Sequence, residues 1–392
     1  MMLLDLGEWS AFGRAEVRAY IQDVSSGNPR LVGGSAMVFR NHLRPVDVYS
    51  YLVARFDRPN GIYDMFKSDD SDNLIQWSYL LKSGDTHIEV LGFTREIQVQ
   101  TSEVVDRKGW EEFVRLLKKD FGRYGKEKHA VQSKLERWHV FQNKFAILAD
   151  TCAELHAEIS DGLDVPFNPV PFAPRREDWE ATHDALRARA DRIYAKCTQL
   201  SLITPVLAEA YLNLMFLVLR KPELRSDDTL AAEFRDRPIH QKLMSMHEVC
   251  QGLAAPLDAA TGPYKRFMQI RAERNDLLHG NMDPVKNYVE EVSFDGKTPL
   301  HHSPGDQSVR YWEALEASAK PQEVIAAYED TLLFLADIGR QLSPDTRRAM
   351  ESISEENTPG FDLHRRICGV LFSGQISQFV HDKRVFDDDL EV

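Results

Sequence analysis

The sequence predicts a mainly helical protein that carries an α+β module at its N-terminal end. Alternating apolar residues around a Ser-Gly-Asp turn indicate strands early in the chain, and apolar residues recur at helical spacing from about residue 128 onwards. Four prolines within residues 166–174 mark a stiff linker between domains. The expected organisation is an α+β regulatory or sensor module, a helical connector with the proline-rich linker, a helical domain, and a helical appendage with an acidic tail, at residues 1–126, 127–174, 175–345 and 346–392.

The composition is that of an ordinary soluble globular protein, with 43% hydrophobic and 28% charged residues among 392. The longest apolar run, 212–219, is interrupted by Asn213 and is too short to span a membrane. The first ten residues lack the basic and apolar segments of a signal peptide. We therefore expect a cytoplasmic protein with no membrane partner, whose reduced, buried thiols form neither a disulfide framework nor a metal site; these thiols belong to Cys152, Cys197, Cys250 and Cys368.

The N-terminal module is expected to contain a β-hairpin. Residues 75–81 and 88–91 read as its strands, with the turn at 83–85, and residues 93–99 add a further strand. The segment 46–56 fits a strand or a helix equally well. Apolar residues from Trp110 to Phe121 recur at helical spacing and predict an amphipathic helix.

The remaining chain is expected to be helical apart from one insertion. A long helix should run from 128 to 163, and 176–220 should give two helices separated near Thr204-Pro205, the second of them buried. Further helices are expected at 239–253, 263–280 and 322–342, an irregular insertion with a short hairpin near 294–296, and a helical appendage from 344. The acids that end the chain should remain solvated; they are Asp387, Asp388, Asp389 and Glu391.

The helix at 263–280 contains the strongest candidate site. The turn at 261–263 and the Gly280-Asn281 pair give this helix clear ends. At 100° per residue, one apolar face combines Phe267, Ile270, Leu277 and Leu278, and Arg274 projects from the middle of it. A charge in that position requires a buried counter-charge or a cleft at an interface.

Arg274, Asn275 and His279 resemble the R-x4-6-H signature of HEPN domains, with Asn275 in the polar slot after the arginine and Gly280 after the histidine. Three other Arg-to-His pairs fit the spacing, at 123–129, 176–183 and 235–240, but only 274–279 lies inside a strong helical pattern. The resemblance covers roughly residues 180–345. It departs from one HEPN branch, silenced by nucleotide transfer, whose tyrosine two residues after the histidine is Asn281 here.

The resemblance implies an all-α, mostly dimeric bundle and, as in many HEPN proteins of toxin, anti-phage and RNA-processing systems, a metal-independent endoribonuclease. It implies that His279 is the general acid or base, that Arg274 stabilises phosphate charge and that Asn275 orients the histidine or binds phosphate. A focused basic cluster within a chain of net charge −13 is expected to bind the RNA substrate; it consists of Lys265, Arg266 and Arg271. No metal or cofactor is expected, and a regulatory partner or trigger would act through the N-terminal module.

Three alternatives to catalysis remain open. Arg274 can be bonded to a core carboxylate such as Glu209, with His279 as a helix-end cation favoured by the helix dipole. The bundle can retain the motif only as a non-catalytic module for RNA or nucleotide binding and dimerisation. The motif can also occur by chance on an unrelated helical scaffold. These alternatives differ in where Arg274 and His279 lie. Catalysis requires both side chains to be exposed in a cleft, whereas a structural role would bury them in the core.

Overall fold

The computed structural model of the chain divides into two compact units. The N-terminal unit comprises Met1–Glu136 together with Phe372–Val392, and the helical unit comprises Arg137–Leu371. The protein is mainly helical, as expected. The proline-rich segment 166–174 lies outside the described residues, which are 2–26, 34–62, 75–93, 95–165, 179–281, 283–285, 288, 290–302, 304–305, 307–371 and 385–392.

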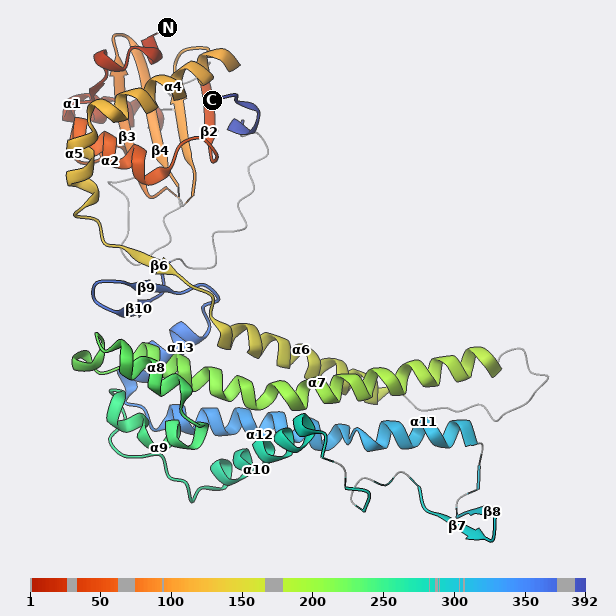
Figure 1. Cartoon of the computed structure of the whole chain (residues 1–392). Coiled ribbons are helices and arrows are strands. Elements are labelled where there is room, and N and C mark those ends of the chain that lie inside the picture. Colours follow the sequence, from red (N-terminus) through yellow and green to blue (C-terminus); the bar gives the residue numbers. More distant parts are fainter. Residues whose placement is uncertain are drawn as a thin grey trace. The chain divides into compact units, whose positions relative to one another are not determined.

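The N-terminal unit is built on an antiparallel sheet with strand order β1-β3-β4-β5-β2 (Figure 1). The predicted hairpin is confirmed, because β3 and β4 pair around a turn in which Gly84 has a φ of 55°. The further strand is confirmed as β5. The strands span Ser10–Ala11 (β1), Ser35–Phe39 (β2), Trp77–Ser83 (β3), Thr86–Gly92 (β4) and Ile97–Thr101 (β5).

Helices cover both faces of this sheet. The ambiguous segment is helix α2 (Pro45–Phe56), which starts with proline at a position where a missing N–H costs nothing. Helix α2 and the predicted amphipathic helix α4 (Arg107–Arg123) pack on the face of the sheet that carries Tyr79 and Leu81. Helix α1 (Arg14–Ser25) packs on the other face against Leu80. A short helix, α5 (Gly125–Gln132), follows α4.

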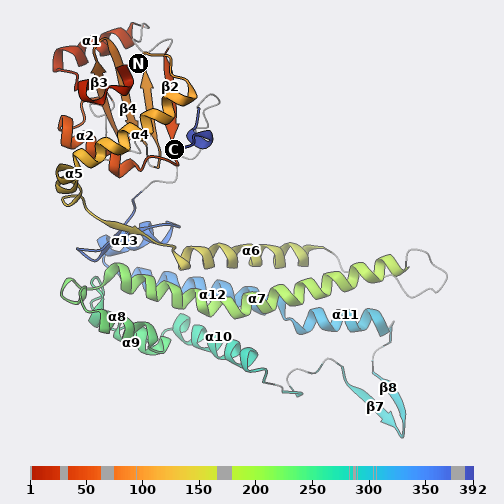
Figure 2. The ribbon, with the colours of Figure 1, turned by 45° about the horizontal axis from the view of Figure 1, so that its top comes forward.

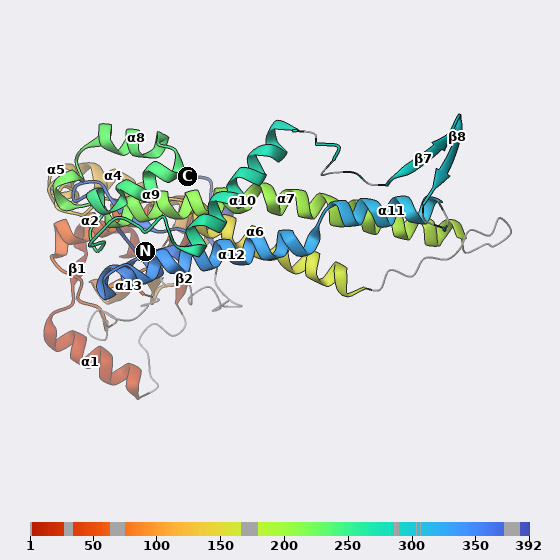
Figure 3. The same cartoon turned by 90° about the horizontal axis from the view of Figure 1, so that it is seen from below.

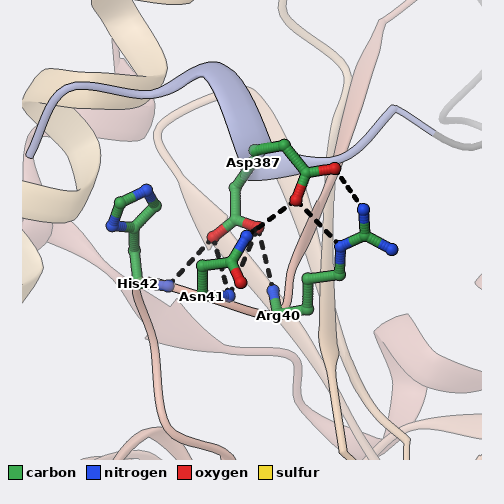
Figure 4. Close-up of polar contacts among 5 residues, drawn as sticks. Arg40, Asn41, His42 and Asp387 are labelled. Atoms are coloured by element: carbon green, nitrogen blue, oxygen red, sulfur yellow. Dashed lines mark hydrogen bonds and ion pairs between the residues drawn. The ribbon is translucent and has the colours of Figure 1, made fainter.

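The acidic end of the chain is solvated only in part: Asp388 and Glu391 are exposed as expected, whereas Asp387 is buried, because residues 385–390 pack beside β2. The N–H of Val38 on β2 donates to the Val385 carbonyl at 2.8 Å. The fully buried Asp387 carboxylate accepts hydrogen bonds from the backbone N–H groups of Arg40 and His42, each at 3.0 Å (Figure 4). Three residues of this end form a short 3-10 helix, η5 (Asp387–Asp389). The tail therefore completes the sheet edge beside β2.

The helical unit is organised around α7 (Trp179–Leu219), which packs along three other long helices (Figures 1 and 2). These are α6 (Lys144–Asp164), α11 (Gln307–Ser318) and α12 (Pro321–Arg340), the last confirming the predicted bundle helix. The predicted helix at 239–253 is α9 (Ile239–Val249). The shorter helices and turns are η3 (Pro222–Leu224), α8 (Asp228–Asp236), α10 (Gly262–His279) and α13 (Pro344–Ser354).

The predicted interruption near Thr204-Pro205 is wrong, since α7 continues through Pro205. Both residues are buried, and Thr204 donates its hydroxyl to the Leu200 carbonyl at 2.7 Å. The flanking Leu200 and Leu207 belong to the core formed with α6. A proline inside a helix costs about 3 kcal/mol relative to alanine. The burial of Leu200 and Leu207 against α6 offsets this cost.

The predicted single helix from 128 to 163 is also wrong, because strand β6 (Trp138–Val140) lies in the middle of it. This strand pairs with β9 (Gly360–Asp362), which pairs in turn with β10 (Ile367–Gly369). Of the apolar residues at helical spacing here, Trp138 belongs to this strand, whose partner is more than 200 residues away, whereas Phe145 and Leu148 lie in α6. Asn143 then caps α6 by accepting from the N–H groups of Phe145 and Ala146.

In the described residues of the expected appendage at 346–392, α13 is followed by strands β9 and β10 and by the short helix η5. The insertion between α10 and α11 contains the expected hairpin, formed by β7 (Val292–Asp295) and β8 (Thr298–His301). Both of its strands are largely exposed. The hairpin lies on the segment that connects the motif helix to the rest of the bundle.

Over the described residues, one helix is long and apolar enough to cross a membrane, the segment Glu180–Leu219 of α7. The apolar run 212–219, expected from the sequence to be too short for a span, forms the C-terminal end of this helix. In its most apolar window, 56% of the residues are buried within the protein. The core helix of a bundle passes the same test of length and composition, so the observation is weak evidence for a membrane span.

Candidate functional site

The helix that carries Arg274 and His279 is α10, and it begins and ends where the sequence predicted. The side chain of Thr261 accepts a hydrogen bond from the N–H of Tyr264, which caps the first turn. Pro263 follows in the first turn. At the other end Gly280 adopts a left-handed conformation with φ of 62°, which glycine tolerates without strain. Local sequence signals therefore fix the length of the motif helix.

Only the first half of α10 packs into the bundle. Phe267 and Ile270 are buried, and the Phe267 ring stacks on Phe334 of α12 with centroids 4.5 Å apart. Leu277 and Leu278 are 43% and 53% exposed. Figure 3 shows the C-terminal end of α10 leaving α7 and α12. The predicted apolar face is thus continuous along the helix, but half of it is uncovered in the single chain.

Arg274 lies at the border between these two halves and is half-buried. Its Nη1 donates to the Asn275 side-chain oxygen at 3.1 Å. Its Nε is buried, and no described residue accepts a hydrogen bond from it. The alternative partner Glu209 is not bonded to Arg274 and pairs with Lys242. The arginine therefore has donor capacity that the described part of the chain leaves unused.

His279 is exposed at the last position of α10. No described residue is hydrogen-bonded to its ring, and the Asn275 side-chain oxygen accepts from Arg274. The asparagine consequently does not orient the histidine within one chain. Arg274 and Asn275 are brought into contact, whereas His279 stands free at the helix end, where the helix dipole favours a cation.

The three basic residues proposed for RNA binding have different surroundings. Lys265 is exposed, and Arg271 is half-buried. Arg266 is held by Asp330 of α12 at 3.0 Å and by Glu273 at 3.5 Å. Arg266 therefore fastens α10 to α12, and it presents less free charge than the sequence suggested.

Sequence reasoning missed a second group of charged residues, on α7 and α9. Lys242 is fully buried, and its ammonium donates to Glu209 at 2.6 Å and to Asn213 at 3.1 Å. The signal was present, because Lys242 shares a face with Ile239, Leu243 and Met246 at helical spacing. A lysine on an apolar face requires a partner.

Within the described part of the chain, no three His, Cys, Asp or Glu side chains are grouped so that they could hold a metal ion. The four cysteines are free thiols. Burial raises the pKa of Cys152 and Cys197 to about 11 and that of Cys250 and Cys368 to about 12. These thiols stay protonated near neutral pH and are poor nucleophiles.

Comparisons with known proteins find no matching family model, and no significantly similar curated protein or solved structure.

Proposed function

We propose that the chain is a cytoplasmic, metal-independent endoribonuclease of the HEPN type that acts as a homodimer. One observation carries the proposal. The half-buried Arg274 keeps an unpartnered Nε one and a half turns from an exposed His279, at the uncovered end of α10. A guanidinium with free donors suits a phosphate, and an exposed imidazole is accessible to RNA and can act as a general acid or base.

The proposed reaction needs no group beyond RNA and these side chains. His279 removes the proton of a 2′-hydroxyl, and the resulting oxygen attacks the adjacent phosphorus. The bond to the 5′-oxygen breaks, and that oxygen takes a proton from an imidazolium. The products are a 2′,3′-cyclic phosphate and a 5′-hydroxyl end. Arg274 stabilises the charge that develops on the non-bridging oxygens.

A second copy of the chain would complete the site. One helix end offers one imidazole, while acid and base steps are served better by two. The exposed Leu277 and Leu278 flank the motif and would be covered by the same residues of a two-fold partner. The N-terminal unit would then serve as the sensor that holds a toxin-like or anti-phage nuclease inactive until a trigger arrives, a role that rests on analogy with HEPN proteins.

The test is cleavage of a mixed-sequence RNA in the presence of EDTA. We expect the wild-type protein to give cyclic-phosphate ends and His279→Ala to be about 10²–10⁴-fold slower. The control is His240→Ala, another exposed histidine at an Arg-to-His spacing. Equal loss in both variants, or cleavage restored only by added Mg²⁺, would overturn the assignment. RNA binding without cleavage would favour the non-catalytic binding module.

The dimer is tested separately by light scattering at micromolar concentration. Leu278→Asp should convert a dimer to a monomer, because it places a charge in an apolar seam. Leu333→Asp is the matched control, since Leu333 is a 58% exposed leucine on α12. A wild-type monomer would contradict the composite site.

A further inference from the structure

A cavity of about 560 Å³ lies in the helical unit, away from the motif helix. It is bordered by α6, α7 and α8 and by the residues around β9. Its volume falls in the range typical of small-molecule sites, and much of its wall is apolar. The apolar wall includes Phe145, Leu148, Val206, Leu217 and Phe361.

The lining of this cavity carries an excess of positive charge. Its lining contains four cationic side chains and two carboxylates, namely Lys144, Arg220, Arg235 and Arg366 with Glu209 and Asp228. Glu209 is engaged by the buried Lys242. Arg366 holds Asp228 through two hydrogen bonds, at 2.5 and 3.1 Å. Both acids are paired, and the lining by itself carries a net surplus of two positive charges in a chain whose net charge is −13.

Arg220 is a buried cation of this lining whose hydrogen bonding is incomplete. It is only 4% exposed, and its Nε is buried without a hydrogen-bond partner among the described residues. Its Nη1 makes a long contact of 3.5 Å to the Asp227 carbonyl, and its guanidinium lies 5.4 Å from the centre of the Phe216 ring. Burial, and then the neighbouring Arg366 charge, lower the pKa of Arg220.

A buried guanidinium with an unused donor is costly unless an anion neutralises it, and the nearby Asp228 carboxylate is engaged by Arg366. A phosphate monoester suits both charge and shape. It carries up to two negative charges, which match the surplus, and its oxygens accept from arginine forks. The apolar remainder of the cavity requires that the phosphate be attached to an aromatic or aliphatic body.

We infer that this cavity binds a small organic phosphate monoester, with the phosphate at Arg220 and Arg366 and the apolar body against Phe145 and Leu217. The site is separate from α10, so it stands or falls independently of the nuclease proposal.

The experiment is calorimetric titration of the full-length protein with naphthyl phosphate. Naphthol, inorganic phosphate and naphthoate are titrated in parallel. We expect naphthyl phosphate to bind most tightly, because only this probe supplies both the apolar body and a dianionic phosphate. Equal binding of naphthol would show an apolar pocket without an anion site. Preferential binding of naphthoate would replace phosphate by carboxylate as the ligand group and overturn the assignment.

Substitutions in the lining of the cavity test whether naphthyl phosphate binds there. Arg220→Met and Arg366→Met should each weaken naphthyl phosphate binding by about 10- to 100-fold through lost charge-assisted hydrogen bonds. Ala210→Trp should block the cavity without removing a charge, which keeps the test decisive if Arg220→Met does not fold. The control is Arg348→Met, an exposed arginine on α13. Unchanged affinity in Arg366→Met and Ala210→Trp, or no binding by the wild-type protein, would refute the site and leave Arg220 as a structural residue stacked on Phe216.

Discussion

The ammonium of Lys242 lies 2.6 Å from the carboxylate of Glu209, in an ion pair that joins α9 to α7. The Glu209 carboxylate, which the sequence suggested as a partner for Arg274, is paired with Lys242. Arg274 is therefore not paired with Glu209, although this does not decide among the roles considered for the arginine.

The two partners of this pair should respond differently to mutation. Lys242 is fully buried, whereas the side chain of Glu209 is 44% exposed. Glu209→Ala leaves a buried ammonium with only Asn213 and should cost about 3 kcal/mol of unfolding free energy. Lys242→Met leaves a carboxylate that water can reach, so it should lower the unfolding free energy by less. Urea denaturation of both variants measures the difference. A larger loss of unfolding free energy in Lys242→Met would mean that Lys242 stabilises the protein mainly through the packing of its aliphatic chain.

The docked C-terminal tail should stabilise the N-terminal unit through one carboxylate. Asp387→Ala removes the acceptor for the N–H groups of Arg40, Asn41 and His42. We expect a loss of about 3 kcal/mol and faster amide hydrogen exchange at these residues. The control is Asp388→Ala, whose half-exposed pair with Arg40 should contribute little because solvent screens it. Equally small effects of the two substitutions would show that η5 is held by its apolar contacts.

Stability of the N-terminal unit should depend on pH through Glu89. This β4 residue is 5% exposed, and burial raises its pKa from 4.5 to about 7. The folded state therefore binds its proton more tightly than the unfolded chain does. The stabilisation is complete below pH 4.5 and is lost as the pH rises towards 7, by about 3 kcal/mol.

Glu89→Gln should reduce the loss of unfolding free energy between pH 4.5 and 7, because a neutral amide does not titrate. Unfolding free energies of wild type and variant, measured from pH 4.5 to 8, give the comparison, with the exposed Glu127→Gln as the control that keeps the wild-type slope. Parallel curves for wild type and Glu89→Gln would show that the buried carboxyl does not govern the pH dependence.

The parts of the fold that sequence reasoning predicted are those determined by neighbouring residues. The ends of α10 follow from Thr261 and Gly280, and the β3–β4 hairpin follows from alternation around Gly84. These signals act within a few residues, so they can be read without knowing the tertiary structure.

The parts that were predicted wrongly depend on distant partners. β6 is a strand because Trp138 pairs with Asp362, and Asp387 is buried because the loop after β2 offers it three N–H groups. α7 continues through Pro205 because α6 covers that face. The exposure of Leu277 could not be predicted from the sequence either. Helical periodicity identifies an apolar face, but it does not show which element packs on that face.

Arg274→Lys should fail to support RNA cleavage even though it keeps the positive charge. The proposed role needs a planar fork that binds two phosphate oxygens at once, and an ammonium does not reproduce that geometry. Loss of a preorganised donor to a developing oxyanion typically costs about 10²–10³-fold in rate. Near-wild-type cleavage by Arg274→Lys would reduce the role of Arg274 to general electrostatic attraction.

The melting temperature of Arg274→Leu then tests the environment of the same residue. Its buried Nε has no partner among the described residues, so replacing Arg274 by leucine removes an unsatisfied donor and should leave stability unchanged or raise it. Cleavage should nevertheless be lost. A stable but inactive Arg274→Leu protein is the result expected if the guanidinium of Arg274 binds substrate and does not stabilise the fold. A marked drop in melting temperature together with lost cleavage would instead identify Arg274 as part of the scaffold of α10.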